Sequence, residues 1–106
     1  MKRYMIRVEM TQRLFDEILQ LANRECVEVN SYLKKIIIKF ANEKKKINID
    51  KMLIKYEAIS GIVNQYDVVI DYSIHAAIKK MAVDEMLKIK EMAIGIIMSH
   101  LQNLKK

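Results

Sequence analysis

Four polar side chains that can hydrogen-bond to a partner recur in two short stretches of alternating sequence. Arg7 and Glu9 stand two residues apart in the first stretch, and Gln65 and Asp67 stand two apart in the second. An arginine can donate two hydrogen bonds to guanine, a glutamine can pair with adenine, and a carboxylate can accept from cytosine. This chemistry would suit recognition of DNA base edges. The alternative is that Arg7 is a solvated residue paired with Glu9 or Asp67, and that Glu9 only orients Arg7.

The first of these stretches predicts a half-buried β-strand. Ile6, Val8 and Met10 alternate with more polar neighbours, which places them on one face of the strand. A single strand leaves both backbone edges unpaired, so it needs a second strand.

Two amphipathic helices are predicted after this strand. Thr11 is a suitable N-cap for the first helix, and Asn30 or Ser31 for the second. Apolar residues three and four positions apart mark the buried faces. They are Leu14, Ile18, Leu21 and Ala22 in the first helix, and Leu33, Ile36, Ile37 and Phe40 in the second.

The apolar pattern recurs after a shift of sixty residues, without a gap. The strand positions then fall on Tyr66, Val68 and Ile70, and the helix positions stay apolar except Phe40, which falls on His100. The pattern predicts two copies of one unit, with strands near residues 4–10 and 64–70. The units would span residues 1–42 and 64–106, joined by a partly helical connector over residues 43–63.

A rival shift of forty-one residues would start the second unit near residue 45. It puts Lys51 and Lys55 at core positions and leaves few residues to cross the domain, so we prefer the shift of sixty. Under this preference, Asp50 caps a short connector helix. Its inner side is expected to carry Leu53, Ile54, Ile59 and Ile62.

Residues 5–42 resemble a complete ribbon-helix-helix unit, closest to the Arc repressor type. The spacing from strand to capped helix matches without insertion, and the Val29-Asn30-Ser31 sequence stands where the family caps its second helix. The resemblance implies a mainly α fold with a two-stranded antiparallel ribbon. In this chain the two copies would form an intramolecular pseudo-dimer.

The resemblance also implies which residues contact DNA. Outward ribbon residues read base edges in that family, and these correspond here to Met5, Arg7, Glu9, Gln65, Asp67 and Val69. It implies phosphate contacts for Val29 and Asn30, and we expect Ser31 and Lys90 to add to them. Lys2 and Arg3 either reach the phosphate backbone beside the groove or form a frayed terminus. Since Asp67 and Val69 are poor phosphate neighbours, the second copy is expected to have diverged, which suits a non-palindromic site.

Composition narrows the function classes. The net charge of +6 is concentrated in residues 1–46, where eleven Lys and Arg face six Asp and Glu, and this favours an anionic partner. The sequence contains no run of 18 apolar residues, so no membrane span is predicted. The single cysteine, Cys26, fits a reducing cytoplasm and is expected to be a small buried residue at the interhelical turn.

Catalytic and metal-binding signals are weak. We expect no enzyme, because there is no glycine-rich phosphate loop, no usefully spaced Cys–His pair and no carboxylate constellation. His75, His100 and Cys26 lack the close spacing of a metal site, so no metal or cofactor is expected.

The sequence therefore predicts sequence-specific binding of double-stranded DNA by a ribbon in the major groove. The expected role is a cytoplasmic transcriptional repressor or regulator from a plasmid or virus, with self-association of fused units on DNA as a further possibility. The alternative is a protein-interaction module on the same fold, either antitoxin-like or a conjugation accessory protein. Its partner would bind through residues 87–106.

Overall fold

The structure, a computed structural model, describes residues 3–105. Two strands and five helices follow one another along the chain. In order they are β1 (Tyr4–Met10), α1 (Gln12–Arg24), α2 (Val29–Glu43), α3 (Lys51–Ala58), β2 (Asn64–Ile70), α4 (Tyr72–Asp84) and α5 (Ile89–Leu104). The expectation of a mainly helical chain with a two-stranded antiparallel ribbon is confirmed.

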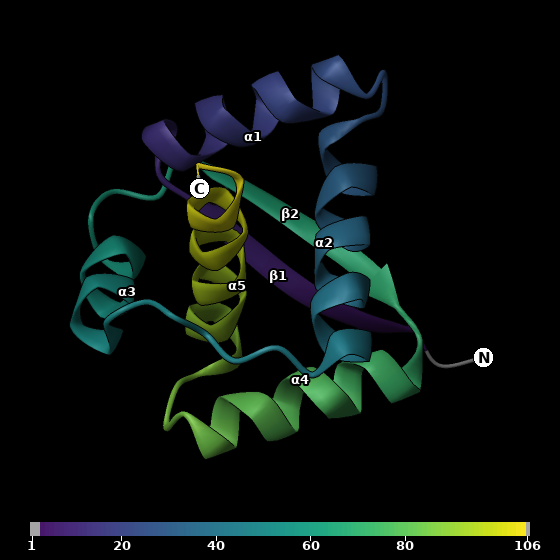
Figure 1. Cartoon of the computed structure of the whole chain (residues 1–106), viewed down its shortest axis with the longest axis vertical. Helices are drawn as coiled ribbons and strands as arrows, with labels where there is room; N and C mark the ends of the chain where they lie inside the picture. The colour runs from purple at the N-terminus through teal and green to yellow at the C-terminus, as the bar shows by residue number, and fades with distance from the viewer. Residues whose placement is uncertain (1–2, 106) are drawn as a thin grey trace.

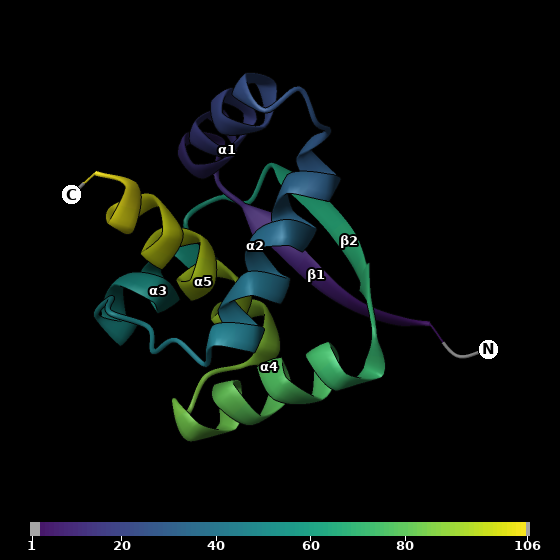
Figure 2. The same ribbon diagram turned by 45° about the vertical axis from the view of Figure 1, so that its right-hand side comes forward.

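The ribbon is formed by the two strands that the sequence predicted, the first from its alternating pattern and the second from the shift of sixty. β1 and β2 run antiparallel, and Arg7 lies opposite Asp67 at the centre of the register. Ile6, Val8 and Val68 point inward and are buried. The helices cover one face of the ribbon (Figures 1 and 2), so alternate residues on the other face are left to solvent.

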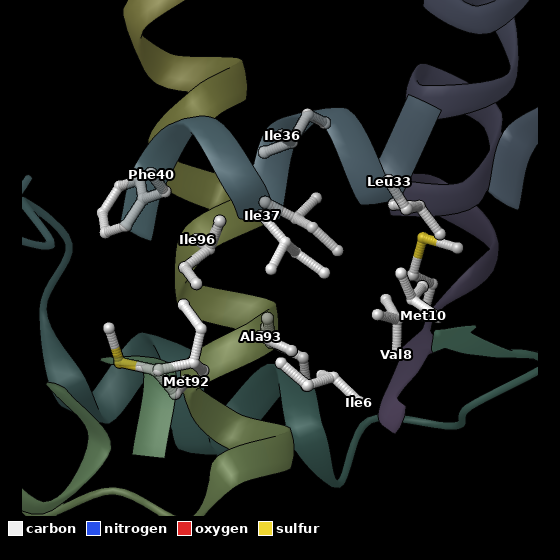
Figure 3. Close-up of a cluster of buried hydrophobic side chains, with 14 of the residues drawn as sticks. Ile6, Val8, Met10, Leu33, Ile36, Ile37, Phe40, Met92, Ala93 and Ile96 are labelled. Carbon is white, nitrogen blue, oxygen red and sulfur yellow. The ribbon is translucent and has the colours of Figure 1, made fainter. Parts of the chain in front are cut away.

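The hydrophobic core lies between the ribbon and the two long helices α2 and α5. Side chains from β1, α2 and α5 point toward one another in this core (Figure 3). They include Ile6, Val8, Met10, Leu33, Ile36, Ile37, Phe40, Met92, Ala93 and Ile96, all of them buried. Burying a large aliphatic side chain contributes about 1.5–3 kcal/mol. Because α2 and α5 come from different halves of the chain, the two halves share one core.

Corresponding elements of the two halves begin sixty residues apart: β2 after β1, α4 after α1 and α5 after α2. The turns between paired helices also match. Cys26 and Met86 occupy the same turn position and have left-handed φ angles of 57° and 58°. The residues before α2 and α5, Glu28 and Lys88, have φ angles of −73° and −72°. Each of these pairs of positions therefore shares one backbone conformation although the residue types differ.

The connector contains α3, as expected, and Asp50 caps it by accepting a hydrogen bond from the Met52 backbone N–H at 2.8 Å. Ile47 and Ile49, which the rival alignment put on a strand, lie in the irregular segment between α2 and α3.

The inner face of α3 differs from the prediction. Ile54 is buried, but Leu53 and Ile59 are exposed, and Ile62 is half-buried beyond the end of the helix. The other buried side chain of α3 is Glu57. The Glu57 carboxylate accepts hydrogen bonds from the Thr11 hydroxyl at 2.9 Å and from an Arg13 Nη2 at 2.7 Å. A buried carboxylate is tolerated when it is paired and hydrogen-bonded in this way. Since both partners belong to a distant segment, the connector's own pattern could not reveal this orientation.

Two local predictions for the first unit were wrong. Neither Asn30 nor Ser31 caps α2, because the chain is extended at Glu28 and helical from Val29, with no side-chain cap. Cys26 is exposed and not buried, because it occupies the left-handed turn position after α1. The cap predicted at Thr11 is confirmed, since its hydroxyl accepts from the Leu14 N–H at 3.4 Å.

Candidate nucleic-acid interface

The solvent-facing side of the ribbon brings together all six residues expected to contact bases. We call this surface the outer ribbon face. It consists of three cross-strand pairs, Met5 with Val69, Arg7 with Asp67, and Glu9 with Gln65. Glu9 is half-buried and the other five are exposed. The period-two alternation of each strand produces this arrangement, because inward residues are held in the core.

The central pair of the outer ribbon face is an ion pair. Arg7 Nε lies 3.3 Å from Asp67 Oδ1, and the two side chains are 61% and 51% exposed. An ion pair this exposed contributes at most about 1 kcal/mol. The contact uses Nε, so the two terminal nitrogens of the guanidinium are directed to no acceptor within residues 3–105. Those nitrogens can still donate to a base or a phosphate.

The neighbouring pair is also linked. Gln65 Nε2 donates to Glu9 Oε2 at 3.2 Å, and Lys90 Nζ lies 4.0 Å from Glu9 Oε1. Lys90 belongs to the first turn of α5, so this contact brings the start of that helix to the edge of the ribbon.

The start of α2 lies against the ribbon as well. Asn30 Nδ2 donates to the backbone carbonyl of Asp67 at 3.1 Å. Val29 is buried, Asn30 is half-buried and Ser31 is exposed. With no side-chain cap, the first N–H groups of α2 keep their capacity to donate. They also lie at the positive end of the helix dipole, which suits an anion such as a phosphate.

An aromatic group at one end of the ribbon was missed by the sequence reasoning. The ring centroid of Tyr4 lies 5.2 Å from that of Tyr72 and 5.4 Å from that of His75. Tyr72 is 65% exposed at the start of α4. The shift of sixty places it on Gln12, so the repeat gave no signal for it. Arg3, the residue before Tyr4, is exposed, whereas Lys2 lies outside the described residues.

The charge of the outer ribbon face is balanced at its centre and positive at its margins. Arg7 is its one cation, against the carboxylates of Glu9 and Asp67. Arg3 and Lys90 add positive charge beside it. An anionic duplex would therefore be held mainly at the margins, while the centre offers hydrogen-bonding groups.

His75 lies at one end of the outer ribbon face, beside Tyr4, and His100 lies away from that face. His100 Nε2 is 2.9 Å from the Tyr32 hydroxyl, between α5 and α2. Within residues 3–105, no three His, Cys, Asp or Glu side chains are grouped as metal ligands would be. In the same range, no helix is both long enough and apolar enough to cross a membrane.

Comparison with known proteins adds no assignment. The chain matches no protein-family model, and comparison with curated proteins and with solved structures finds no significant match.

Proposed function

We propose that this chain is a pair of fused ribbon-helix-helix units that binds double-stranded DNA sequence-specifically, as a transcriptional repressor or regulator. The observation that carries the proposal is the ribbon itself. It presents alternate side chains to solvent on one face and has the start of a helix against each strand: Asn30 bonds to β2, and Lys90 approaches Glu9 of β1. A two-stranded ribbon of this kind fits the major groove.

The fused arrangement is supported by the sixty-residue spacing of the elements and by the matched turn angles at Cys26 and Met86. The register supports it too. Arg7 and Asp67 are equivalent under the shift of sixty, and they face each other at the centre of the ribbon. Residues that lie on a two-fold axis meet their own equivalents in this way. The connector keeps the two strands in one molecule, at a high effective concentration.

In the proposed complex, base contacts come from the outer ribbon face. Arg7 would turn its terminal nitrogens to a guanine, and Gln65 would pair with an adenine. The uncapped start of α2, at Val29 to Ser31, and the start of α5 at Lys90 would hold phosphates on either side. Phosphate contacts of this type fix the position and orientation of a protein on the duplex.

The site read in this way would not be palindromic. Arg7 is replaced by Asp67 in the second strand, and Glu9 by Val69. Identical half-sites require identical reading residues, so the two halves of this ribbon would prefer different bases.

The test compares DNA binding by the parent, Arg7→Ala and Asp67→Asn. Binding is measured by fluorescence anisotropy at about 50 and about 200 mM salt. Binding of the parent to random-sequence duplex should weaken steeply between these salt concentrations. On a duplex selected for tight binding, Arg7→Ala should lose about 1–3 kcal/mol of binding free energy. Asp67→Asn should strengthen binding to random duplex, because it removes a negative charge from the outer ribbon face.

Lys35→Ala is the matched control. Lys35 is also an exposed cation paired with a carboxylate, since its Nζ contacts Glu25, but it lies on the outer side of α2. It should change affinity far less than Arg7→Ala. If both alanine variants bind alike, Arg7 does not read bases. If the parent binds no duplex at the lower salt concentration, the DNA proposal fails.

The second candidate is a protein-interaction module, and the charge balance of the outer ribbon face favours it. Arg7 and Gln65 are already bonded to carboxylates, which reduces their attraction to DNA. A partner would bind through residues 87–106, as the sequence suggested. Since Met92 to Ile97 are buried, the available side chains of α5 are those near its two ends.

A further inference from the structure

The outer side of α3 carries an unusual concentration of exposed apolar side chains. We call it the α3 outer face, and it comprises Met52, Leu53 and Tyr56 of the helix and Ile59, which follows its last residue. Their exposed fractions are 73%, 56%, 67% and 82%. Scattered exposed apolar residues are ordinary, but a contiguous apolar patch of this kind indicates an interaction site.

The α3 outer face is a continuous stripe along one side of the helix. Met52, Tyr56 and Ile59 are spaced by four and three residues, so they point the same way. They lie opposite Ile54 and Glu57, which attach α3 to the rest of the molecule. In both ribbon views α3 lies at the edge of the molecule on the outer side of α5 (Figures 1 and 2). The chain's own fold therefore uses only the inner side of α3.

We propose that the α3 outer face binds the same face of a second copy of this chain. Four large side chains that are each more than half exposed offer on the order of 500 Å² per molecule. Two copies would together bury on the order of 1,000 Å², the lower bound for a specific interface. A weak, reversible dimer follows from that area, because association also costs translational and rotational freedom.

The stripe is suited to pairing with itself. When identical helices cross antiparallel about a two-fold axis, each residue meets the one equally far on the other side of that axis. With Tyr56 next to the axis, Met52 of one copy faces Ile59 of the other. The contact is then apolar along its length, with an aromatic side chain at its centre.

Charge gives this dimer a distinctive salt dependence. Lys51 and Lys55 border the stripe on one side, and Lys51 has an acidic neighbour in Glu85 at 3.7 Å. Each molecule also carries a net charge of +6. Added salt screens this repulsion while leaving apolar contact intact. Self-association through the α3 outer face should therefore strengthen with salt, whereas DNA binding should weaken.

The test is the molecular mass in solution, measured by sedimentation equilibrium without DNA. Protein from about 5 to about 300 µM would be compared at about 50 and about 500 mM NaCl. The parent should change from monomer to dimer with concentration, and more readily at the higher salt. Tyr56→Ser combined with Ile59→Ser should stay monomeric throughout.

The control is Val83→Ser combined with Met86→Ser. These side chains are 68% and 81% exposed, nearly the same as Tyr56 and Ile59, but they belong to α4 and the turn after it. The control should dimerise like the parent. Should the test variant melt earlier than the parent, Met52→Ser replaces it, because that side chain is 73% exposed and outside the core.

Three results would overturn the proposal. They are a parent that stays monomeric in all conditions, a dimer that survives in the test variant, and association that weakens with salt. A parent that stays monomeric would mean that the α3 outer face does not bind a second copy and is available to a different protein. Since no DNA is present, none of these results depends on the function proposed above.

Discussion

His100 and Tyr32 form a polar contact between α5 and α2. Burial, together with the charges of Lys39, Lys45 and Lys35, lowers the pKa of His100 below its ordinary value, and Glu25 opposes this shift. Burial raises the pKa of Tyr32, so its hydroxyl stays protonated and can donate to the neutral imidazole. The native state therefore favours neutral His100.

This contact makes stability depend on pH. A histidine whose pKa is lower in the folded state stabilises the protein fully above its unfolded pKa, and this contribution is lost as the pH falls through the folded value. The melting temperature of the parent should drop between about pH 7 and about pH 5 more than that of His100→Gln. Glutamine keeps a hydrogen-bonding group near Tyr32 without titrating in this range.

His75→Gln is the control, because His75 lies at the end of the ribbon beside Tyr4. Melting curves by circular dichroism at both pH values measure the effect. Equal drops in the parent and His100→Gln would show that protonation of His100 does not oppose folding.

Single residues also show where sequence reasoning stops. The outward positions of the ribbon and the cap at Thr11 followed from local pattern, because both depend on neighbours in sequence. The burial of Glu57 did not, because Thr11 and Arg13 lie more than forty residues away. Nor could the pattern indicate that Asn30 bonds to the backbone of β2.

At the scale of elements, α2 and α5 differ in how much of their surface is buried. The shift of sixty aligns Lys34, Lys35 and Lys39 of α2 with Ile94, Gly95 and Ser99 of α5. The three lysines are exposed, whereas their counterparts are buried. The reason is the connector, since α3 and Ile47 cover this side of α5. The sequence shows that α5 lacks lysines at these positions, but it does not show that α3 covers them.

Gly95 sets how closely α3 approaches α5. A Cβ atom at this position would lie 2.7 Å from Ile47 Cδ1 and 3.0 Å from Ile54 Cδ1. Gly95→Leu should therefore displace the connector and destabilise the protein by about 1–3 kcal/mol or more, as overpacking does. Urea denaturation, compared at the midpoint, measures this loss.

Lys35→Leu is the equivalent change in α2. Lys35 is exposed, so its replacement should alter stability by no more than about 0.5 kcal/mol. Equal losses for Gly95→Leu and Lys35→Leu would mean that the connector does not pack against α5 as described.

At the scale of the whole molecule, the two halves depend on the same core. Ile6 of the first half lies beside Ala93 of the second (Figure 3), and Val8 and Met92 are buried in the same cluster. A chain of 106 residues with a shared core should unfold in a single cooperative transition. The sequence predicted the positions of the strands and helices, but the core that makes the two halves interdependent required the structure.

Val8→Asp tests this dependence. Val8 is 0% exposed, so the change buries an unpaired charge and should cost at least about 3 kcal/mol. Met5→Asp, on the outward side of the same strand, should cost far less, because Met5 is 53% exposed. Circular dichroism of the helices and the near-ultraviolet signal of the five tyrosines should report the same melting transition.

Two separate transitions in the parent, or a Val8→Asp variant that loses only the signal of one half, would contradict a shared core. So would equal melting temperatures for Val8→Asp and Met5→Asp, which would reverse the assignment of the strand faces.

The central pair of the ribbon has an evolutionary consequence. In an assembly of two identical chains, one codon specifies both residues that meet on the symmetry axis, so an arginine there would face an arginine, and like charges directly opposite are unfavourable. Here two codons specify Arg7 and Asp67, and opposite charges meet. The residues on each strand of the ribbon can therefore mutate independently, so the two ends of the ribbon can become chemically different.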